Sequence, residues 1–193
     1  VSSTGSAPLL PPIAGLKDRI DNENHNIYSI LGMISHINDF PKDLEGKKVV
    51  VVGGGAVGLD VVEFFADRNA DISIVEMMDQ IGRDLDPVSK NDTKTMMKKH
   101  NVHQLTKTAL LEVKDSSFLV RGDGEPYELP FEYGFVCLGM RAQGQLYQNL
   151  TEEFSSEDVE IINIGDSQRA RRIIDGTQEG RNVLTVLEQK GYL

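Results

Sequence analysis

Cysteine is scarce in this sequence, because its 193 residues include only Cys137. One cysteine cannot form a disulfide or a CxxC redox motif within the chain, nor supply the four thiolates of an iron–sulfur cluster. Cys137 lies in the apolar run 135–138, so we expect it to be a core residue. The four histidines also lack the spacing of paired metal ligands; they are His25, His36, His100 and His103. We therefore expect no metal site.

Long apolar runs and positive charge are lacking as well. The longest apolar runs, such as 49–52, are far too short to span a bilayer, and no signal sequence opens the chain. Twenty basic residues against thirty acidic ones give a net charge of -10, which disfavours nucleic acids and anionic membranes as partners. With 39% apolar residues, the composition indicates a folded globular protein, and we expect a cytoplasmic location.

The pattern that is present begins with the valines at 49–52, which are typical of a parallel strand buried on both faces. Apolar residues then recur at helical intervals as far as Asn69, and 72–75 indicates a second strand. Together these segments predict a strand–helix–strand unit. Asp86 followed by proline predicts the N-cap of a helix that runs to about His100, where a histidine suits the negative end of the helix dipole.

Further strands are predicted along the rest of the chain. Residues 102–105 and 135–138 indicate two more parallel strands, and three short segments joined by tight turns indicate an antiparallel meander at 109–113, 117–121 and 127–129. One more strand is expected at 160–164 and an amphipathic helix at 173–190. Between 27 and 34, apolar residues at helical spacing indicate a short helix or linker.

The motif G-x-G-x-x-G, formed by Gly53, Gly55 and Gly58, directly follows the valine strand and opens the first helix. Gly53 permits the sharp turn, Gly55 lets the backbone approach a diphosphate, and Gly58 allows close packing of helix on strand. The amides of the helix start, together with the helix dipole, suit the phosphate charge. We therefore expect the cofactor-binding segment to comprise Gly53, Gly54, Gly55, Ala56, Val57 and Gly58.

Glu76 lies eighteen positions after Gly58, at the end of the second strand, where a carboxylate can accept both ribose hydroxyls of adenosine. A carboxylate there repels a 2′-phosphate, and the following Met77 and Met78 supply no positive charge, so the sequence favours NAD(H) over NADP(H). Arg83 has the reach to contact such a phosphate, but we expect a surface ion pair with Asp84 or Asp86. The alternative is a purely structural turn with an ordinary surface glutamate.

Three further motifs resemble those of flavoprotein reductases of the glutathione reductase superfamily. The first is Ser3-Thr4-Gly5-Ser6-Ala7-Pro8 together with Pro12-Ile13-Ala14-Gly15; the second is Phe135-Val136-Cys137-Leu138-Gly139; the third is Ile161-Ile162-Asn163-Ile164-Gly165-Asp166. The continuation at 171–180 most resembles the C-terminal half of the NADH:flavin oxidoreductase and 2,4-dienoyl-CoA reductase group within the old yellow enzyme family. The chain opens inside the first motif without an initiator methionine, so we expect a piece of a longer protein.

The resemblance implies an α/β fold, with a Rossmann-like parallel sheet and an antiparallel meander, flanked by pieces of a second such domain. It implies an FAD-domain segment and linker at 1–40, an NAD(H)-binding domain at 41–141 and a C-terminal FAD-domain segment at 142–193. It also adds Thr4, Gly5, Gly139, Gly165 and Asp166 to the cofactor-binding residues, with Gly165 and Asp166 against the ribityl and pyrophosphate part of FAD. Taken without the resemblance, Gly165 and Asp166 indicate a strand-to-helix turn with aspartate as N-cap.

The function that the resemblance implies is that of a fragment of an NADH-dependent flavin oxidoreductase, inactive alone, which binds NADH and positions it for hydride transfer to FAD. The cofactors perform the chemistry, so no catalytic side chain is expected. An FMN domain and an iron–sulfur cluster would belong to missing regions, and the expected partner is the remainder of the flavoprotein, with oligomer formation left open. Two alternatives stay open: an NAD(H)-sensing module without catalysis, and a disulfide reductase or NADH oxidase of the same superfamily.

Overall fold

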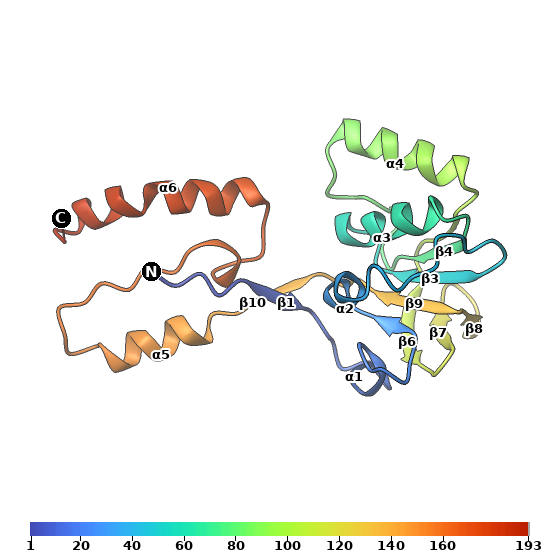
Figure 1. The fold of residues 1–193 in the computed structure, drawn as a ribbon, viewed down its shortest axis with the longest axis horizontal. Coiled ribbons are helices and arrows are strands. Elements are labelled where there is room, and N and C mark those ends of the chain that lie inside the picture. The colour runs from blue at the N-terminus through green and yellow to red at the C-terminus, as the bar shows by residue number, and fades with distance from the viewer. Residues whose placement is uncertain (193) are drawn as a thin grey trace. The chain divides into compact units, whose positions relative to one another are not determined.

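The computed structural model describes residues 1–192 and divides the chain into two compact units (Figure 1). The large unit is Pro8–Gly139, and the small unit combines Val1–Ala7 with the chain from Met140 onward. Within the described residues, no helix is long and apolar enough to cross a membrane.

A five-stranded parallel sheet forms the centre of the large unit. Its strand order is β2-β9-β3-β4-β5, and the strands are β2 (Ile27–Tyr28), β9 (Tyr133–Val136), β3 (Lys48–Val52), β4 (Asp71–Val75) and β5 (His103–Leu105). Pairing of β3 with β4 runs from Lys48 opposite Asp71 to Val52 opposite Val75. The four valines of β3 are all buried, which confirms the prediction of a central parallel strand.

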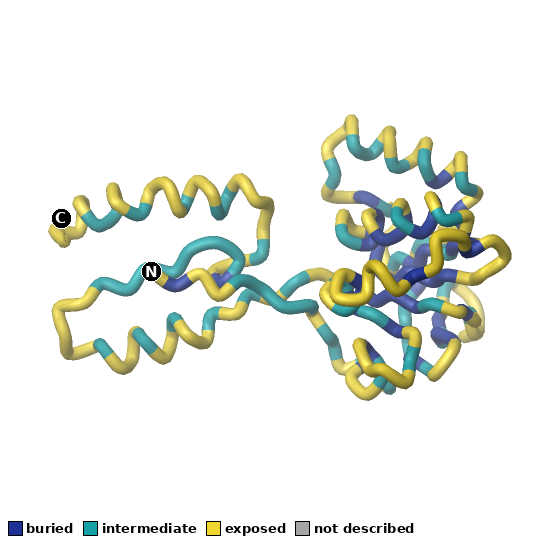
Figure 2. Tube along the Cα trace, viewed as in Figure 1, coloured by how far each residue is buried: buried dark blue, intermediate teal, exposed yellow. Residues whose placement is uncertain are grey.

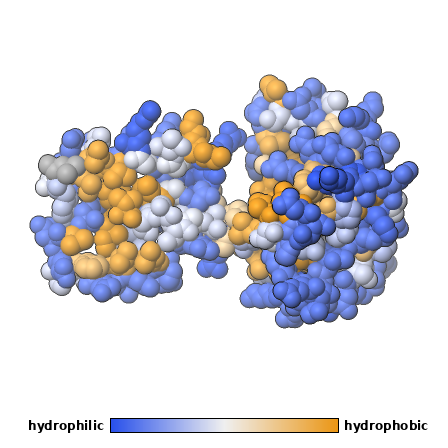
Figure 3. Space-filling view, in the orientation of Figure 1, coloured by the Kyte–Doolittle hydropathy of each residue, from blue (hydrophilic) through white to orange (hydrophobic). Residues whose placement is uncertain are grey.

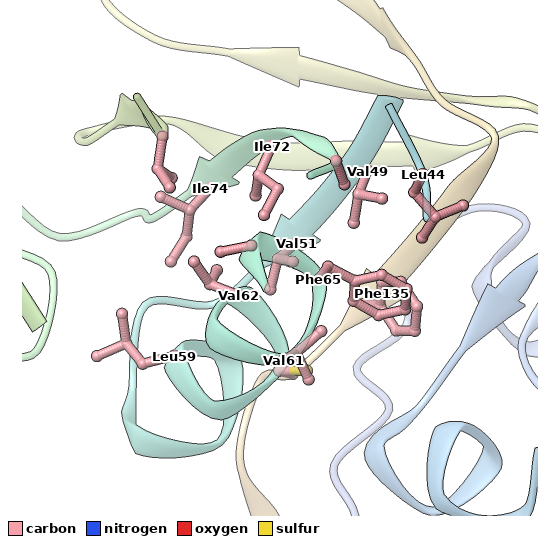
Figure 4. Close-up of a cluster of buried hydrophobic side chains, with 14 of the residues drawn as sticks. Leu44, Val49, Val51, Leu59, Val61, Val62, Phe65, Ile72, Ile74 and Phe135 are labelled. Atoms are coloured by element: carbon pink, nitrogen blue, oxygen red, sulfur yellow. The ribbon is translucent and has the colours of Figure 1, made fainter. Parts of the chain in front are cut away.

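Helices cover one face of this sheet. Because successive side chains of a strand point to opposite faces, Val49 and Val51 share a face, and α3 (Ala56–Ala66) packs on it. Phe65 of α3 packs against Phe135 of β9, with tilted rings whose centroids are 4.8 Å apart (Figure 4). The longer α4 (Pro87–Lys99) contributes Met97 to the same cluster, and its bounds match the predicted helix closely.

The predicted antiparallel meander is present, and it covers the opposite face of the sheet. It consists of β6 (Ala109–Val113), β7 (Ser117–Arg121) and β8 (Tyr127–Pro130), and it is antiparallel throughout. Val50 and Val52 of β3 pack there against Phe118 and Val120 of the meander. The short α1 (Leu16–Arg19) adds Leu16, which is fully buried. The predicted fold class is confirmed by this architecture, in which the sheet is buried on both faces.

Two details of the large unit differ from the predictions. Ile27–Tyr28 forms an edge strand paired with β9, and a helix, α2 (Ile30–Ser35), follows it, whereas we expected only a helix or linker. Residues 8–40 thus pack in the same compact unit as the five-stranded sheet. β9 ends at Val136, two residues earlier than predicted, although the amide of Cys137 still donates to the carbonyl of Val52.

The small unit contains few regular elements and no buried apolar side chain among its described residues (Figure 2). A two-stranded sheet joins β1 (Ser6–Pro8) to β10 (Met140–Ala142), and two helices follow: α5 (Gln145–Glu153), which was not predicted, and α6 (Ile173–Gln189), which was. The strand expected at 160–164 was wrong. Within the described residues, this segment makes a single bridge, from Asn163 to Ser2, which is too little pairing to form a strand, while β1 and β10 pair with each other.

Candidate functional site

The turn between β3 and α3 requires glycine at Gly53. Its φ of 108° lies in the left-handed region, and a Cβ there would lie 2.1 Å from the carbonyl oxygen of Cys137. Its amide donates to the carbonyl of Val75, which fixes the turn between the two neighbouring strands. The backbone of this turn is therefore held on both sides by the sheet.

Gly55 and Gly58 differ in what surrounds them, as their expected roles require. A Cβ at Gly58 would lie 1.9 Å from the carbonyl oxygen of Gly53, so the helix packs directly on the turn. At Gly55 a Cβ would meet no atom within 4 Å, and the residue is exposed. Space is thus open beside Gly55, as the close approach of a ligand to the backbone would require.

The start of α3 has no side-chain cap. Gly55 is its N-cap residue, no side chain accepts a hydrogen bond from the first turn, and that turn contains no acidic residue. The amides of Ala56 and Val57 have no partner within the helix, because they precede the first helical hydrogen bond, which Leu59 donates to Gly55. This end of α3 has the free amides and the positive dipole end that suit a diphosphate.

The Glu76 side chain points toward this glycine loop. Its Oε2 accepts a hydrogen bond from the amide of Gly54 at 2.6 Å, and its Oε1 accepts one from the amide of Met78 at 2.7 Å. These two bonds fix the carboxylate, and each oxygen keeps a second lone pair for a ribose hydroxyl. Met77, which follows, is 68% exposed, and it offers an apolar thioether side chain beside the carboxylate.

Gly139 lies near the end of the neighbouring strand, β9. On one side of β3 the sheet continues with β4 and β5, and on the other side with β9 and β2. The strand order therefore reverses direction between β3 and β9. Ligands of open α/β sheets bind outside the carboxyl ends of the strands at such a reversal. Gly139 has a φ of 104° and nothing within 4 Å of its Cβ direction, so the backbone there is also open to a ligand.

Gly82 was not predicted as part of this region. Its amide donates to the carbonyl of Gly54 at 2.7 Å, which ties the loop after β4 to the glycine loop. Its φ of 66° lies in the left-handed region that favours glycine, and the glycine itself was the signal in the sequence. The loop that carries Arg83 is therefore anchored beside the glycine motif.

The predicted surface pair of Arg83 with Asp84 or Asp86 was wrong. Among the ion pairs of residues 1–192, none includes Arg83, and its side chain is exposed. Asp86 is occupied otherwise, because its Oδ1 accepts from the amides of Val88 and Ser89 as the N-cap of α4. These bonds and that of the Ser89 hydroxyl lower the pKa of Asp86, with the hydroxyl bond contributing most.

Cys137 is a core residue, as predicted, and does not offer a reactive thiolate. It is 8% exposed, and burial, together with the charge of Asp60, raises its pKa to about 12. A thiol with such a pKa is protonated at neutral pH. Within residues 1–192, no group of three or more metal-ligating side chains comes together, and His100 lies at the C-cap of α4.

The remaining predicted site residues lie in the small unit. The hydroxyl of Thr4 donates to the carbonyl of Gln143, and Gly5 has a φ of 77°. Gly165 opens a 3-10 turn, η1 (Gly165–Ser167), and its amide donates to Glu179 Oε2 at 2.6 Å. Asp166 accepts from the Ser6 hydroxyl at 3.1 Å.

The alternative role of Asp166 as a helix N-cap is wrong. Its Oδ1 accepts from the amide of Arg171, ahead of α6, but the N-cap residue of α6 is Arg172. The carboxylate nevertheless has lone pairs left for further hydroxyl groups. The amide of Gly165, by contrast, is already used by Glu179, whose pKa this bond and the Arg171 ion pair lower.

Comparison with known proteins assigns the chain to a family. The family model described as pyridine nucleotide-disulphide oxidoreductase matches residues 1–163. The NADH oxidase of Thermoanaerobacter brockii is 26% identical over 184 residues, which cover 95% of this chain and 27% of that protein. A solved complex of 2-naphthoyl-CoA reductase with 2-naphthoyl-CoA gives a TM-score of 0.75 at 21% identity, over 92% of this chain and 25% of that one.

A second solved structure is an engineered water-forming NADPH oxidase bound to NADPH. It gives a TM-score of 0.58 at 16% identity, over 76% of this chain and 27% of that one. At these identities, both structures are similar in fold alone. The chain spans less than a third of the length of these relatives. With 163 of its 193 residues matched, the chain belongs to the pyridine nucleotide-disulphide oxidoreductase family.

Proposed function

We propose that the large unit binds NADH and positions it for hydride transfer to FAD, as part of an NADH-dependent flavin oxidoreductase. The single observation that carries the proposal is the uncapped start of α3 beside the fixed Glu76 carboxylate. The amides at the start of α3 suit a diphosphate, and the Glu76 carboxylate suits the adjoining ribose. Their separation along the chain is typical of a dinucleotide-binding strand–helix–strand unit. Nicotinamide and flavin supply the hydride chemistry when bound; the protein supplies binding and position.

Coenzyme choice is also part of the proposal. In the engineered NADPH oxidase, four substituted positions follow a first one at intervals of 18, 19, 20 and 25 residues. Counted from Gly58, these intervals lead to Glu76, Met77, Met78 and Arg83. That enzyme lost a carboxylate at the first of these intervals and gained arginines at the second and the last. This chain keeps its carboxylate and has methionine at the second, which supports a preference for NADH.

The small unit is proposed to be part of the FAD domain. Asp166 retains acceptor capacity for the ribityl hydroxyls, while Thr4 and Gly5 lie in the motif that resembles the flavin-binding segment. Both helices of the unit leave apolar residues uncovered; these include Leu146, Ile173, Ile174 and Leu184 (Figure 3). In the proposal, other parts of the flavoprotein cover this face and complete the FAD site. The finer resemblance to the 2,4-dienoyl-CoA reductase group belongs to this proposal too.

A charge placed at the start of α3 tests the NADH site. Gly55 has a φ of -78° and open space at its Cβ, so Gly55→Asp fits the backbone, and aspartate is a favoured N-cap residue. We expect the protein to stay folded while its negative charge weakens NADH binding at least about tenfold, because it faces the diphosphate. The measurement is a titration of the chain with NADH, followed by nucleotide fluorescence, with thermal unfolding of each variant alongside.

Two controls separate charge from shape and position. Gly55→Asn has nearly the same shape without the charge, so it should bind NADH more tightly than Gly55→Asp. Gly124→Asp places the same charge in a turn of the meander, where a Cβ also meets no atom within 4 Å, and it should not change binding. NADH binding that is unaffected by Gly55→Asp, or absent from the unaltered chain, would reject the proposed site.

The name of the bacterial relative favours a second candidate, an NADH oxidase of the same family. The two functions share the NADH site and differ in the electron acceptor. Measurement of oxygen consumption by the complete flavoprotein with NADH distinguishes them. Oxygen uptake that accounts for the electrons of the NADH consumed, without any added acceptor, supports the oxidase. Slow oxygen uptake, together with NADH consumption that an organic acceptor accelerates, supports the reductase.

A further inference from the structure

Basic side chains gather along one face of α4, in a chain whose net charge is -10. Lys90, Lys94 and Lys98 recur every four residues, so they lie in a row over successive turns, about 6 Å apart along the helix axis. Lys94 and Lys98 are exposed, and none of the three forms an ion pair among the described residues. The lysine row is therefore a line of positive charge about 12 Å long.

The lysine row borders a groove between α4 and the edge strand β5. Lys90 and Lys94 line a cleft of about 540 Å³. Lys94 and Lys98 line a second cleft, of about 700 Å³. Lys94, Met97 and Gln104 line both clefts, so the two form one groove that follows the helix.

Little negative charge faces this groove. Among the described residues that line it, Asp79 is the one carboxylate, in the loop after β4. Asp71 lies beside it, because its Oδ1 is 3.5 Å from Nε2 of His103, which lines the second cleft. Asp92, the acidic residue of α4, lines the cleft between α4 and α3 instead. The groove therefore favours a negatively charged ligand.

Strand β5 offers free backbone groups to such a ligand, because it is an edge of the sheet and pairs with β4 alone. The carbonyl of Leu105 accepts from the amide of Glu76, so it points toward β4. Backbone groups of successive strand residues alternate in direction, and those of Gln104 therefore point away from β4, to the free edge. An extended chain can add to this edge as another strand.

We propose that the groove between α4 and β5 is a docking site for an extended acidic segment of a partner protein. Alternate side chains of an extended chain lie about 6.6 Å apart on one face, close to the spacing of about 6 Å in the lysine row. Carboxylates at three alternate positions thus pair with Lys90, Lys94 and Lys98, while the backbone of the segment bonds to Gln104.

The shape and composition of the groove favour this occupant over other anions. The lysines lie in line and do not converge on one point, as a single small anion would require. A nucleic acid strand is disfavoured by the net charge of -10, and no phenylalanine, tyrosine or tryptophan among the described lining residues is placed to stack on its bases.

The test titrates the 193-residue chain with a fluorescent peptide and follows anisotropy at low salt. The probe alternates three glutamates with valines and has capped ends. A second peptide of the same composition has its three glutamates in succession, so it keeps the charge and loses the spacing. We expect the alternating peptide to bind at least about threefold more tightly. Its affinity should fall as salt is added, because the paired charges are exposed.

Substitutions in the lysine row locate the site. Lys94→Gln should weaken binding of the alternating peptide about two- to fivefold, the range of one exposed ion pair. Lys90→Gln, Lys94→Gln and Lys98→Gln combined should weaken it about 10- to 100-fold. Lys99→Gln is the matched control, since Lys99 is also exposed on α4 but lines neither cleft, and it should leave the affinity nearly unchanged. Thermal unfolding shows that each variant is folded.

Peptides with methylated amides test the added strand. Methylation of the valine amides blocks one edge of the extended peptide, and methylation of the glutamate amides blocks the other. One of the two should lose affinity and the other should keep it, because a single edge faces β5. If both peptides keep their affinity, or both lose it equally, strand addition is rejected.

Three results would overturn the docking site as a whole. The first is no binding of the alternating peptide to the unaltered chain at low salt. The second is equal binding of the two peptide orders, or an equal loss in Lys99→Gln and Lys94→Gln, either of which shows unspecific attraction of charge. The third is tighter binding of inorganic phosphate or of a short oligothymidylate, which shows an anion site of another class.

Discussion

A glycine can be required for two separate reasons: its backbone has a positive φ, or a Cβ would overlap neighbouring atoms. Gly53 of the glycine loop meets both conditions, and Gly46 meets only the first. Gly53 and Gly46 both have positive φ, at 108° and 73°. They differ in their surroundings, since a Cβ at Gly53 would overlap the carbonyl of Cys137 at 2.1 Å, whereas nothing lies within 4 Å at Gly46. The pair therefore distinguishes a conformational requirement from a packing requirement.

Alanine at each of these glycines should show the difference. Gly46→Ala should lower the free energy of unfolding by about 1 kcal/mol, the cost of a positive φ alone. Gly53→Ala should lower it by clearly more, about 2 kcal/mol or above, because the turn or the end of β9 must also move. Urea unfolding of both variants measures this. Equal losses would show that the close approach at Cys137 contributes little.

Elements that depend on short stretches of sequence were predicted well, and those that depend on distant partners were not. The β3–α3–β4 unit, α4 and the meander have clear periodicity within their own residues, and α4 has an aspartate cap followed by proline. β2 is two residues long and exists because β9, far along the chain, pairs with it. The strand expected at 160–164 fails for the converse reason, because its single bridge within the described residues joins Asn163 to Ser2.

The candidate site divides in the same way. Gly53, Gly55, Gly58 and Glu76 were found from sequence because their roles follow from fixed spacing within one strand–helix–strand unit. The Gly82 bond to Gly54 was missed, since a carbonyl contact leaves no pattern in the sequence. Backbone contacts between loops of this kind appear only once the chain is folded.

The cap of α4 gives a pH-dependent prediction at the scale of the element. Hydrogen bonds lower the pKa of Asp86 below its ordinary 3.8, so its contribution to stability is complete above that value and is lost as the pH falls through the lower pKa of the folded state. Asp86→Ala should therefore unfold at a lower temperature than the unaltered chain at neutral pH, and the difference should shrink below pH 3.8.

The neutral substitution Asp86→Asn provides the control, because asparagine also caps helices but does not titrate in this range. Its melting temperature should be closer to that of the unaltered chain at neutral pH. Thermal unfolding followed by circular dichroism between neutral and acidic pH measures all three proteins. If the difference in melting temperature between Asp86→Ala and the unaltered chain stays constant down to acidic pH, ionisation of Asp86 does not contribute to the stability of the cap.

At the scale of the whole chain, stability is concentrated in the large unit. Both hydrophobic clusters lie there, on the two faces of the parallel sheet. Among the described residues of the small unit, the buried side chains are Ser2 and Ser167, and neither α5 nor α6 buries a residue. Burial of apolar area is the main favourable term in folding, so the small unit has little to stabilise it alone.

The large unit alone, Pro8–Gly139, should therefore fold and bind NADH as the whole chain does. It contains every residue of the proposed NADH site, from the glycine loop and Glu76 to Gly139. We expect its melting temperature and NADH affinity to match those of the 193-residue chain, and limited proteolysis of that chain should cut after Met140 before it cuts within the sheet. The prediction is contradicted if the large unit is unfolded on its own, or if α5 and α6 resist proteolysis as well as β3 does. Either result would show that the small unit contributes to the stability of the chain.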